Sequence, residues 1–346
     1  MDKRFTDILA RVYPNEKTRE NYASRLRGLV RKVEADSLLD ILEAPETWYP
    51  RIQEGYPSLT TRKNVLTAIL VLFREDPTLA AQEETKRFWH KRHDELNRHQ
   101  DARVKRSEPA DKQIAQYTSY EEIEATYEKL KRSSPHKTSR ASQQFLLLSI
   151  LVHLRPKRAD LGAVEVFDEK DPNRTDLNYI VLRKEGTSFL KMNVYKTSQH
   201  YRTVEEDIPE GLVRDIRQSF ARWPRTYLFT KEDGSAMSNN VYSRFVMRTF
   251  EDLFGRSTGV SLLRHIYISE KLDFDDMTME EQDEEARLML HTSGLQRQYK
   301  WPKKTICPKL CGYVGSKGTR KKPRPSTRPP PAPQTRRKRR QGGSSP

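Results

Sequence analysis

The sequence predicts a mainly α-helical protein with one small antiparallel β-sheet, an α+β fold. Two observations predict it. Apolar residues recur at helical spacing through most of the first 90 residues and again after residue 117. Between residues 177 and 208, short apolar and β-branched runs alternate with Gly186 and polar breaks, which is the pattern of short strands.

The first hundred residues are expected to form a helical module. In "TRENYASRLRGLVRKVEA" (18–35) the apolar residues share one face and Arg and Lys occupy the other. A second helix is expected over 58–76, where Ser58 can cap the N-terminus, and a polar third helix over 79–100. Residues 101–116 are polar and contain Pro109, so we expect a linker there.

A second domain is expected over residues 117–302. Its helical patterns are followed by a very acidic stretch, "LDFDDMTMEEQDEEA". The predicted helices cover residues 119–133, 141–154, 209–222, 238–254 and 258–272.

The net charge of +16 is concentrated at the C-terminal end. Residues 303–346 contain fourteen Lys and Arg and no acidic residue, which leaves about +2 for the rest of the chain. This Pro-rich, aromatic-poor segment is expected to be a disordered basic tail. Its "RRKRR" suits a nuclear localisation signal, a phosphate-binding arm or a plain solvated extension, so any DNA-binding function must rest on residues 1–302.

Few features point to a metal, a membrane or secretion. Cys307 and Cys311 are the only cysteines, a weak metal signal and no disulfide framework, and a reducing compartment fits best. No run of about 18 apolar residues is present, and the first residues are too charged for a signal peptide. We therefore expect no cofactor, no metal and a protein that is neither secreted nor membrane-bound.

Four places in the second domain contain polar residues that a core would seldom choose. Arg158 lies in "LRPKRADLGAV", Lys196 in "NVYKTSQ" and Arg264 in the apolar "SLLRHIYIS", and the last place is "HTSGLQRQY", with His291 and Tyr299. Taken singly, most have plain explanations. An arginine can cap a helix C-terminus, a hairpin lysine is usually solvated, and a tyrosine usually packs. Arg264 is harder to explain, because a buried guanidinium needs a partner.

Taken together and in this order, the four places resemble the tyrosine recombinase (phage-integrase) family, especially recombinases of large DNA viruses and mobile elements. The resemblance covers about residues 5–302. It implies a helical core-binding domain followed by a catalytic domain. In that domain Arg158, Lys196, Arg264 and His291 would be catalytic and Tyr299 the nucleophile.

The chain departs from the family pattern at two points. The family's histidine-x-x-arginine motif would place a histidine at position 261, where this chain has Ser261. His265 follows Arg264 and is expected on another face of the helix. The spacing of eight residues between His291 and Tyr299 is one shorter than is common. On one straight helix these two residues would not share a face, so Thr292, Ser293 and Gly294 are expected to form a turn between two helices.

The chemistry implied by the resemblance is strand transfer through a 3′-phosphotyrosyl intermediate without a metal. Two planar guanidinium groups can each form bidentate hydrogen bonds with the non-bridging phosphate oxygens, and a histidine adds a further donor. A cationic site stabilises the tyrosine phenolate, and a hairpin lysine can protonate the departing 5′-oxygen.

The implied partner is double-stranded DNA, bound as a homotetramer on two sites. Arg19, Arg25, Arg62 and Lys63 lie on expected polar helix faces and are candidates for phosphate contacts. The expected activity is site-specific recombination or integration in a host nucleus or viral replication compartment. Two alternatives stay open: a type IB topoisomerase-like nicking-closing enzyme, and a DNA-binding protein of this fold with weakened catalysis.

Overall fold

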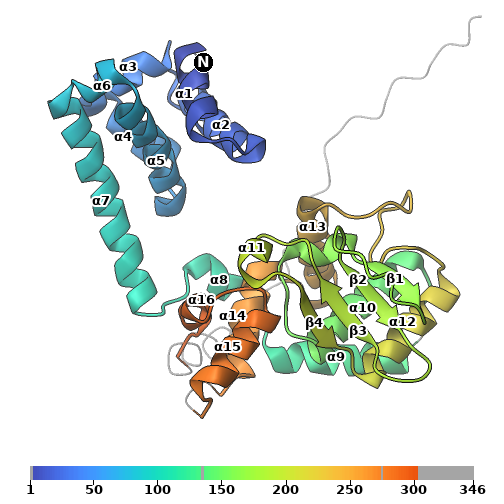
Figure 1. Cartoon of the computed structure of the whole chain (residues 1–346). Coiled ribbons are helices and arrows are strands. Elements are labelled where there is room, and N and C mark those ends of the chain that lie inside the picture. Colours follow the sequence, from blue (N-terminus) through green and yellow to red (C-terminus); the bar gives the residue numbers. More distant parts are fainter. Residues whose placement is uncertain (1–2, 134–135, 274–275, 303–346) are drawn as a thin grey trace, which may run out of the picture.

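The computed structural model describes residues 3–133, 136–273 and 276–302, and these form helices with one four-stranded sheet (Figure 1). The predicted mainly helical α+β class is confirmed. Cys307, Cys311 and the predicted basic tail lie outside the described residues. Within the described ranges, no helix is both long and apolar enough to cross a membrane.

The first group of helices encloses its own apolar core. The core runs from Phe5 to Leu96 and includes Trp89, which is fully buried. The expected Ser58 cap is present, since its side chain accepts a hydrogen bond from the amide of Thr61. The elements are α1 (Lys3–Val12), α2 (Glu16–Val33), α3 (Leu38–Glu43), α4 (Pro45–Gly55), α5 (Leu59–Glu75), α6 (Pro77–Ala80) and α7 (Glu83–Lys105).

The segment expected as a linker is largely helical. Helix α7 continues to Lys105 and leads toward α8 (Asp111–Ala115), as Figure 1 shows. Beyond it, a second core runs from Tyr117 to Trp301 and shares no residue with the first.

The second group of helices shares one core with the sheet and ends in the segment that contains the candidate site. The helix expected before the His291 turn is α15 (Met279–Leu288), which begins within the acidic stretch and whose N-terminus is closed by a Thr278–Glu281 capping box. The remaining elements are α9 (Tyr120–Arg132), α10 (Ser139–His153), the 3₁₀ helix η1 (Ala159–Ala163), α11 (Ser198–Tyr201), α12 (Glu210–Arg222), α13 (Asn239–Phe254), α14 (Val260–Glu270), α15 (Met279–Leu288) and α16 (Ser293–Tyr299).

The sheet is mixed, with strand order β1-β2-β3-β4. The strands are β1 (Glu165–Asp168), β2 (Tyr179–Leu182), β3 (Phe189–Met192) and β4 (Val204–Asp207). The last three pair antiparallel as expected, but β1 pairs parallel to β2. Strand β1 was not expected from the sequence, because its four residues, EVFD, form neither an apolar run nor an alternating pattern.

Candidate active site

His291 is positioned by the way α15 ends. Leu290 adopts a left-handed conformation (φ 59°), the amide of Leu290 bonds to the carbonyl of Arg287, and the amide of His291 bonds to that of Ala286. These two bonds are those of a Schellman motif, which usually has glycine where Leu290 stands. Leu290 is fully buried, so its packing offsets the strain of that backbone conformation. The expected break between two helices is present but lies earlier than predicted, at Met289–Thr292. Thr292 caps α16, Ser293 and Gly294 are the first residues of that helix, and Tyr299 lies at its end.

The carbonyls at the end of α15 accept hydrogen bonds from the neighbours of two other candidate residues. The Lys157 ammonium donates to the carbonyl of Leu288, and the Thr197 hydroxyl donates to that of Leu290 over 3.0 Å. Lys157 precedes Arg158, and Thr197 follows Lys196. Three segments far apart in the sequence therefore meet at this helix end.

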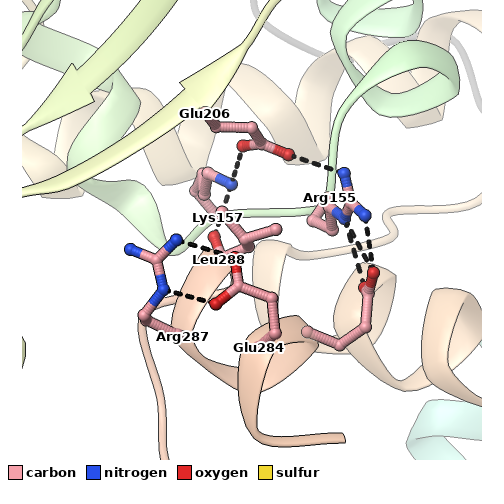
Figure 2. A network of polar contacts seen from close by, with 7 residues as sticks. Arg155, Lys157, Glu206, Glu284, Arg287 and Leu288 are labelled. Atoms are coloured by element: carbon pink, nitrogen blue, oxygen red, sulfur yellow. Dashed lines mark hydrogen bonds and ion pairs between the residues drawn. The ribbon is translucent and has the colours of Figure 1, made fainter. Parts of the chain in front are cut away.

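A buried ionic network fixes the same junction (Figure 2). Lys157 pairs with Glu206 of β4, and Arg155 bonds both to Glu206, at 3.3 Å, and to Glu285 of α15, at 2.6 Å. Lys157 and Glu206 are buried, and burial lowers the pKa of the Lys157 ammonium. A buried charge that loses its partner destabilises a protein strongly, so the network holds the Arg158 segment, the sheet and α15 in one arrangement.

Arg264 connects His291 with Tyr299. One guanidinium nitrogen donates to the Tyr299 hydroxyl over 3.1 Å, and another donates to Nδ1 of His291. The guanidinium carbon lies 4.6 Å from the centre of the Tyr299 ring, and the rings of His291 and Tyr299 are 5.6 Å apart. Arg264 and His291 are buried and Tyr299 is half-buried. The structure therefore brings three of the five predicted catalytic residues into direct contact.

The contact with Arg264 determines which ring nitrogen of His291 carries the proton. Arginine has no acceptor atom, so Nδ1 of His291 must accept and Nε2 must bear the proton. That Nε2–H is buried and has no hydrogen-bond partner among the described residues. The Nε–H groups of Arg264 and Arg158 are likewise buried and without a partner there. Unpaired buried donors cost free energy, so three of them on predicted catalytic residues suit an anionic ligand.

The site is strongly electropositive. Burial, together with the neighbouring Arg264 and Arg158 cations, lowers the pKa of His291 to about 3. Burial also lowers the pKa of Arg264 to about 10, with Arg158 acting in the same direction. At neutral pH the imidazole is therefore a neutral donor beside two cations, which is suited to a phosphate diester.

His265 holds the end of α16. Its Nδ1–H donates to the carbonyl of Tyr299 over 2.8 Å, and its ring stacks on Trp301 with centroids 4.2 Å apart. The Trp301 amide donates to the Ser269 hydroxyl over 2.9 Å, and the Trp301 ring is buried near that of Tyr117. These contacts fix the backbone on both sides of the Tyr299 side chain.

The prediction that His265 lies on another face of the helix than position 261 is wrong. Ser261 and His265 are four residues apart on α14, hence one helical turn, and both line a pocket of about 250 Å³ beside Tyr299. His265 thus shares the face of position 261, although its ring is used in the contacts with Trp301 and the Tyr299 carbonyl.

Arg158 and Lys196 are near this centre without touching it. Arg158 occupies the N-cap position of η1 without a side-chain hydrogen bond to that helix. It is half-buried, and its charge lowers the pKa of both Arg264 and His291. Lys196 is exposed, and its ammonium makes no hydrogen bond or ion pair with the described residues. Its place is fixed by Thr197, which leaves the lysine side chain itself able to move.

Among the proposed phosphate contacts, Arg62 needs correction. Its side chain is buried, and its guanidinium donates to the carbonyls of Gln53 and Tyr56 at the end of α4, so it does not lie on an open polar face. The sequence could not reveal this, because those carbonyls come from the preceding helix. Arg19, Arg25 and Lys63 are half-buried, and Arg25 lies over the ring of Tyr22.

Several residues of the site were not expected from the sequence. Lys157, Glu206 and Glu285 are charged residues whose burial depends on tertiary contacts alone. Gln296 is fully buried on α16, and neither atom of its amide has a partner among the described residues. Its position three residues before Tyr299, on the same helix, was the only available signal. In the described ranges no cluster of His, Cys, Asp and Glu is arranged to hold a metal ion.

Comparison with solved structures gives distant matches, one of which is a recombinase. No family model matches the chain, and no curated protein matches it. A crystal structure of XerA recombinase aligns with this chain at 10% sequence identity and a TM-score of 0.38. The alignment covers 90% of this chain and 97% of the XerA chain. A TM-score of 0.38 is too low to support a function, which therefore rests on the geometry of the site.

Proposed function

We propose that the protein is a tyrosine recombinase, a DNA strand transferase that forms a 3′-phosphotyrosyl intermediate at Tyr299. The observation that supports this most strongly is the contact of Arg264 with both Tyr299 and His291, surrounded by buried donors without partners. A scissile phosphate beside Tyr299 would satisfy the Nε2–H of His291 and the guanidinium groups of Arg264 and Arg158.

The proposed step is in-line attack by the Tyr299 hydroxyl oxygen on phosphorus. The new bond joins tyrosine oxygen to phosphorus, the bond to the 5′-oxygen breaks, and Lys196 supplies the proton to that oxygen. The tyrosine proton leaves to solvent, and Arg264 stabilises the phenolate that attacks. A 5′-hydroxyl of the same or another strand reverses the step, so the energy of the phosphodiester bond is kept.

The rest of the chain gives this site its DNA. We propose that residues 1–100 form a DNA-binding module that closes on the duplex opposite the catalytic residues 117–302, and that four protomers act on two duplexes. Arg19, Arg25 and Lys63 remain the proposed phosphate contacts of that module.

Covalent capture tests the proposal. The protein is incubated with a pool of nicked 40-bp duplexes of randomised sequence, in which the short cleaved fragment diffuses away and traps the adduct. We expect a slowly migrating adduct with the wild type and with Tyr227→Phe, a control far from the site in sequence, but none with Tyr299→Phe. EDTA should leave the yield unchanged, because the proposed charges and protons come from side chains.

The same experiment separates the alternatives. Sequencing of trapped DNA should yield one recurring site for a recombinase. Relaxation of supercoiled plasmid at many sites would instead favour a topoisomerase-like enzyme. If duplex is bound but never becomes covalently linked at low salt, the protein is a binding module and the proposal is wrong.

A further inference from the structure

A cationic groove runs along α13, outside the candidate active site. It has a volume of about 980 Å³ and is open to solvent between α13, the start of α10 and the segments after α12. Five of its lining residues are basic, against two acidic ones, Glu232 and Asp233. The basic residues are Arg140, Arg225, Lys231, Arg244 and Arg248.

The five cations differ in how their charge is used. Arg225 points inward and donates to the carbonyls of Trp223 and Leu228, and burial lowers its pKa to about 10, so it supports the wall of the groove. Arg140 pairs with Asp252. Lys231 lies 3.4 Å from Asp233.

Arg244 and Arg248 are exposed, and neither is paired with a carboxylate of the described residues. They are four residues apart and therefore project from the same side of α13. Like charges at this spacing weaken a helix by a few tenths of a kcal/mol. Their arrangement is unfavourable for the free helix and favourable for an extended anion that lies along it.

The start of α13 is joined closely to the candidate active site. The amide of Met237 bonds to the carbonyl of Gly162 over 2.9 Å, and a side chain at position 162 would meet that segment's backbone at 2.6 Å. Gly162 belongs to η1, which directly follows Arg158, and Asn239 at the first turn of α13 hydrogen-bonds to Asp160. The groove therefore has a fixed position relative to Arg158.

We propose that this groove binds the DNA backbone that flanks the cleaved phosphate, with Arg244 and Arg248 as its phosphate contacts. The inference rests on the proposed function, since it takes the same duplex as substrate. At about 1.5 Å per residue, Arg244 and Arg248 lie about 7.5 and 13.5 Å beyond Asn239 along the axis of α13. The two arginines are therefore about 6 Å apart along the helix, close to the distance between successive phosphate groups, and suit two neighbouring phosphates of one strand.

The salt dependence of DNA binding tests the proposal without requiring cleavage. Affinity for a 30-bp duplex of mixed sequence is measured from 50 to 200 mM salt in a Tyr299→Phe background. Arg244→Gln with Arg248→Gln should reduce the slope of log K against log salt by roughly 2, because two phosphate contacts are lost. Arg225 is left intact because it supports the wall of the groove.

A matched control removes the same charge elsewhere. Lys170 and Lys184 are exposed near the end of the sheet where β1 and β2 stop, away from the segment that contains Lys196. Lys170→Gln with Lys184→Gln should leave the slope unchanged. An equal fall in both double variants, or no fall in the groove variant, would overturn the inference.

Chemistry separates this inference from the proposed function. In the wild-type Tyr299 background, the groove variant should still form the covalent adduct but should need more DNA to reach half of its maximal rate, whereas the Lys170→Gln with Lys184→Gln control should need no more than the wild type. Once the cleaved phosphate is mapped, neutral methylphosphonates placed one at a time at the flanking phosphates should weaken wild-type binding at two neighbouring positions and leave binding by the groove variant unaffected. If the adduct forms but neither the groove substitutions nor the methylphosphonates weaken DNA binding, only the inference about the groove is refuted. If they weaken binding but no adduct forms with any variant, only the proposed function is refuted.

Discussion

The Thr197 hydroxyl donates a hydrogen bond to the carbonyl of Leu290 over 3.0 Å. This contact joins the segment between β3 and β4 to the turn that precedes His291. Lys196 is therefore placed beside the candidate site by its neighbour, while its own side chain stays in solvent. Such an arrangement suits a general acid that meets its substrate only when DNA is bound.

If Lys196 protonates the departing oxygen, the defect of Lys196→Met depends on the leaving group. We expect cleavage of an ordinary duplex to slow by roughly 100-fold or more, the usual contribution of a general acid. A duplex with sulfur in place of the bridging 5′-oxygen should be cleaved at nearly the wild-type rate, because a thiolate leaves without a proton. Lys184→Met serves as the control, and a defect of equal size on both substrates would exclude the role of Lys196.

Variants of the network around Lys157 should distinguish its effect on stability from its effect on catalysis. Lys157→Met leaves Glu206 with one partner fewer and should destabilise the fold by about 3 kcal/mol, measured by denaturant unfolding. Lys157→Met with Glu206→Leu removes both charges and should recover most of that stability. Adduct formation should stay low in the double variant, since the Leu288 carbonyl still lacks its donor. Full recovery of cleavage would show that the network is structural only.

Gln296 should lower the stability of the fold and at the same time contribute to cleavage. Its amide is buried without partners among the described residues, so Gln296→Leu should raise the unfolding free energy by about 1 kcal/mol. We expect adduct formation to fall at the same time, because the amide is then missing from the DNA-bound site. Gln298→Leu, an exposed position on the same helix, should give no gain in stability. A variant that is more stable and fully active would remove Gln296 from the site.

Two histidines with lowered pKa values, the buried His291 and the half-buried His265, should make the fold sensitive to acid. Burial lowers the pKa of His265 to about 4 and that of His291 to about 3, whereas an unfolded histidine titrates near 6.5. Between these values the unfolded chain binds more protons, so stability is constant above about pH 6.5 and falls as pH drops toward 4. His291→Asn should flatten this slope in denaturant titrations at several pH values. An unchanged slope would contradict the burial of a neutral imidazole at that position.

Periodicity predicted the helices well, because each buries one face within its own core. Residues 58–76 and 119–133 were expected as helices, and α5 and α9 fall within them with Ser58 and Ser119 as caps. Strand β1 was missed because it is too short to show a pattern. The helix before His291 was expected only from the turn that follows it, because α15 is so acidic that its apolar positions are few.

The candidate site could be predicted only as far as a resemblance in order and spacing allowed. That reasoning selected Arg264, His291 and Tyr299, which are in contact. It could not select Lys157 or Gln296, because the burial of an isolated polar residue depends on segments far away in the sequence. It also misplaced Arg62, whose guanidinium bonds to carbonyls that no side-chain pattern reports.

The central claim is that Tyr299 becomes bonded to DNA, and peptide mapping of the trapped adduct tests it most directly. Trypsin cleaves after Arg297 and Lys300, so the nucleotide should be found on the short peptide 298–300. Its mass should be that of the peptide plus the 3′-nucleotide left after nuclease digestion. A nucleotide on any other peptide, or an adduct that persists in Tyr299→Phe, would contradict the account.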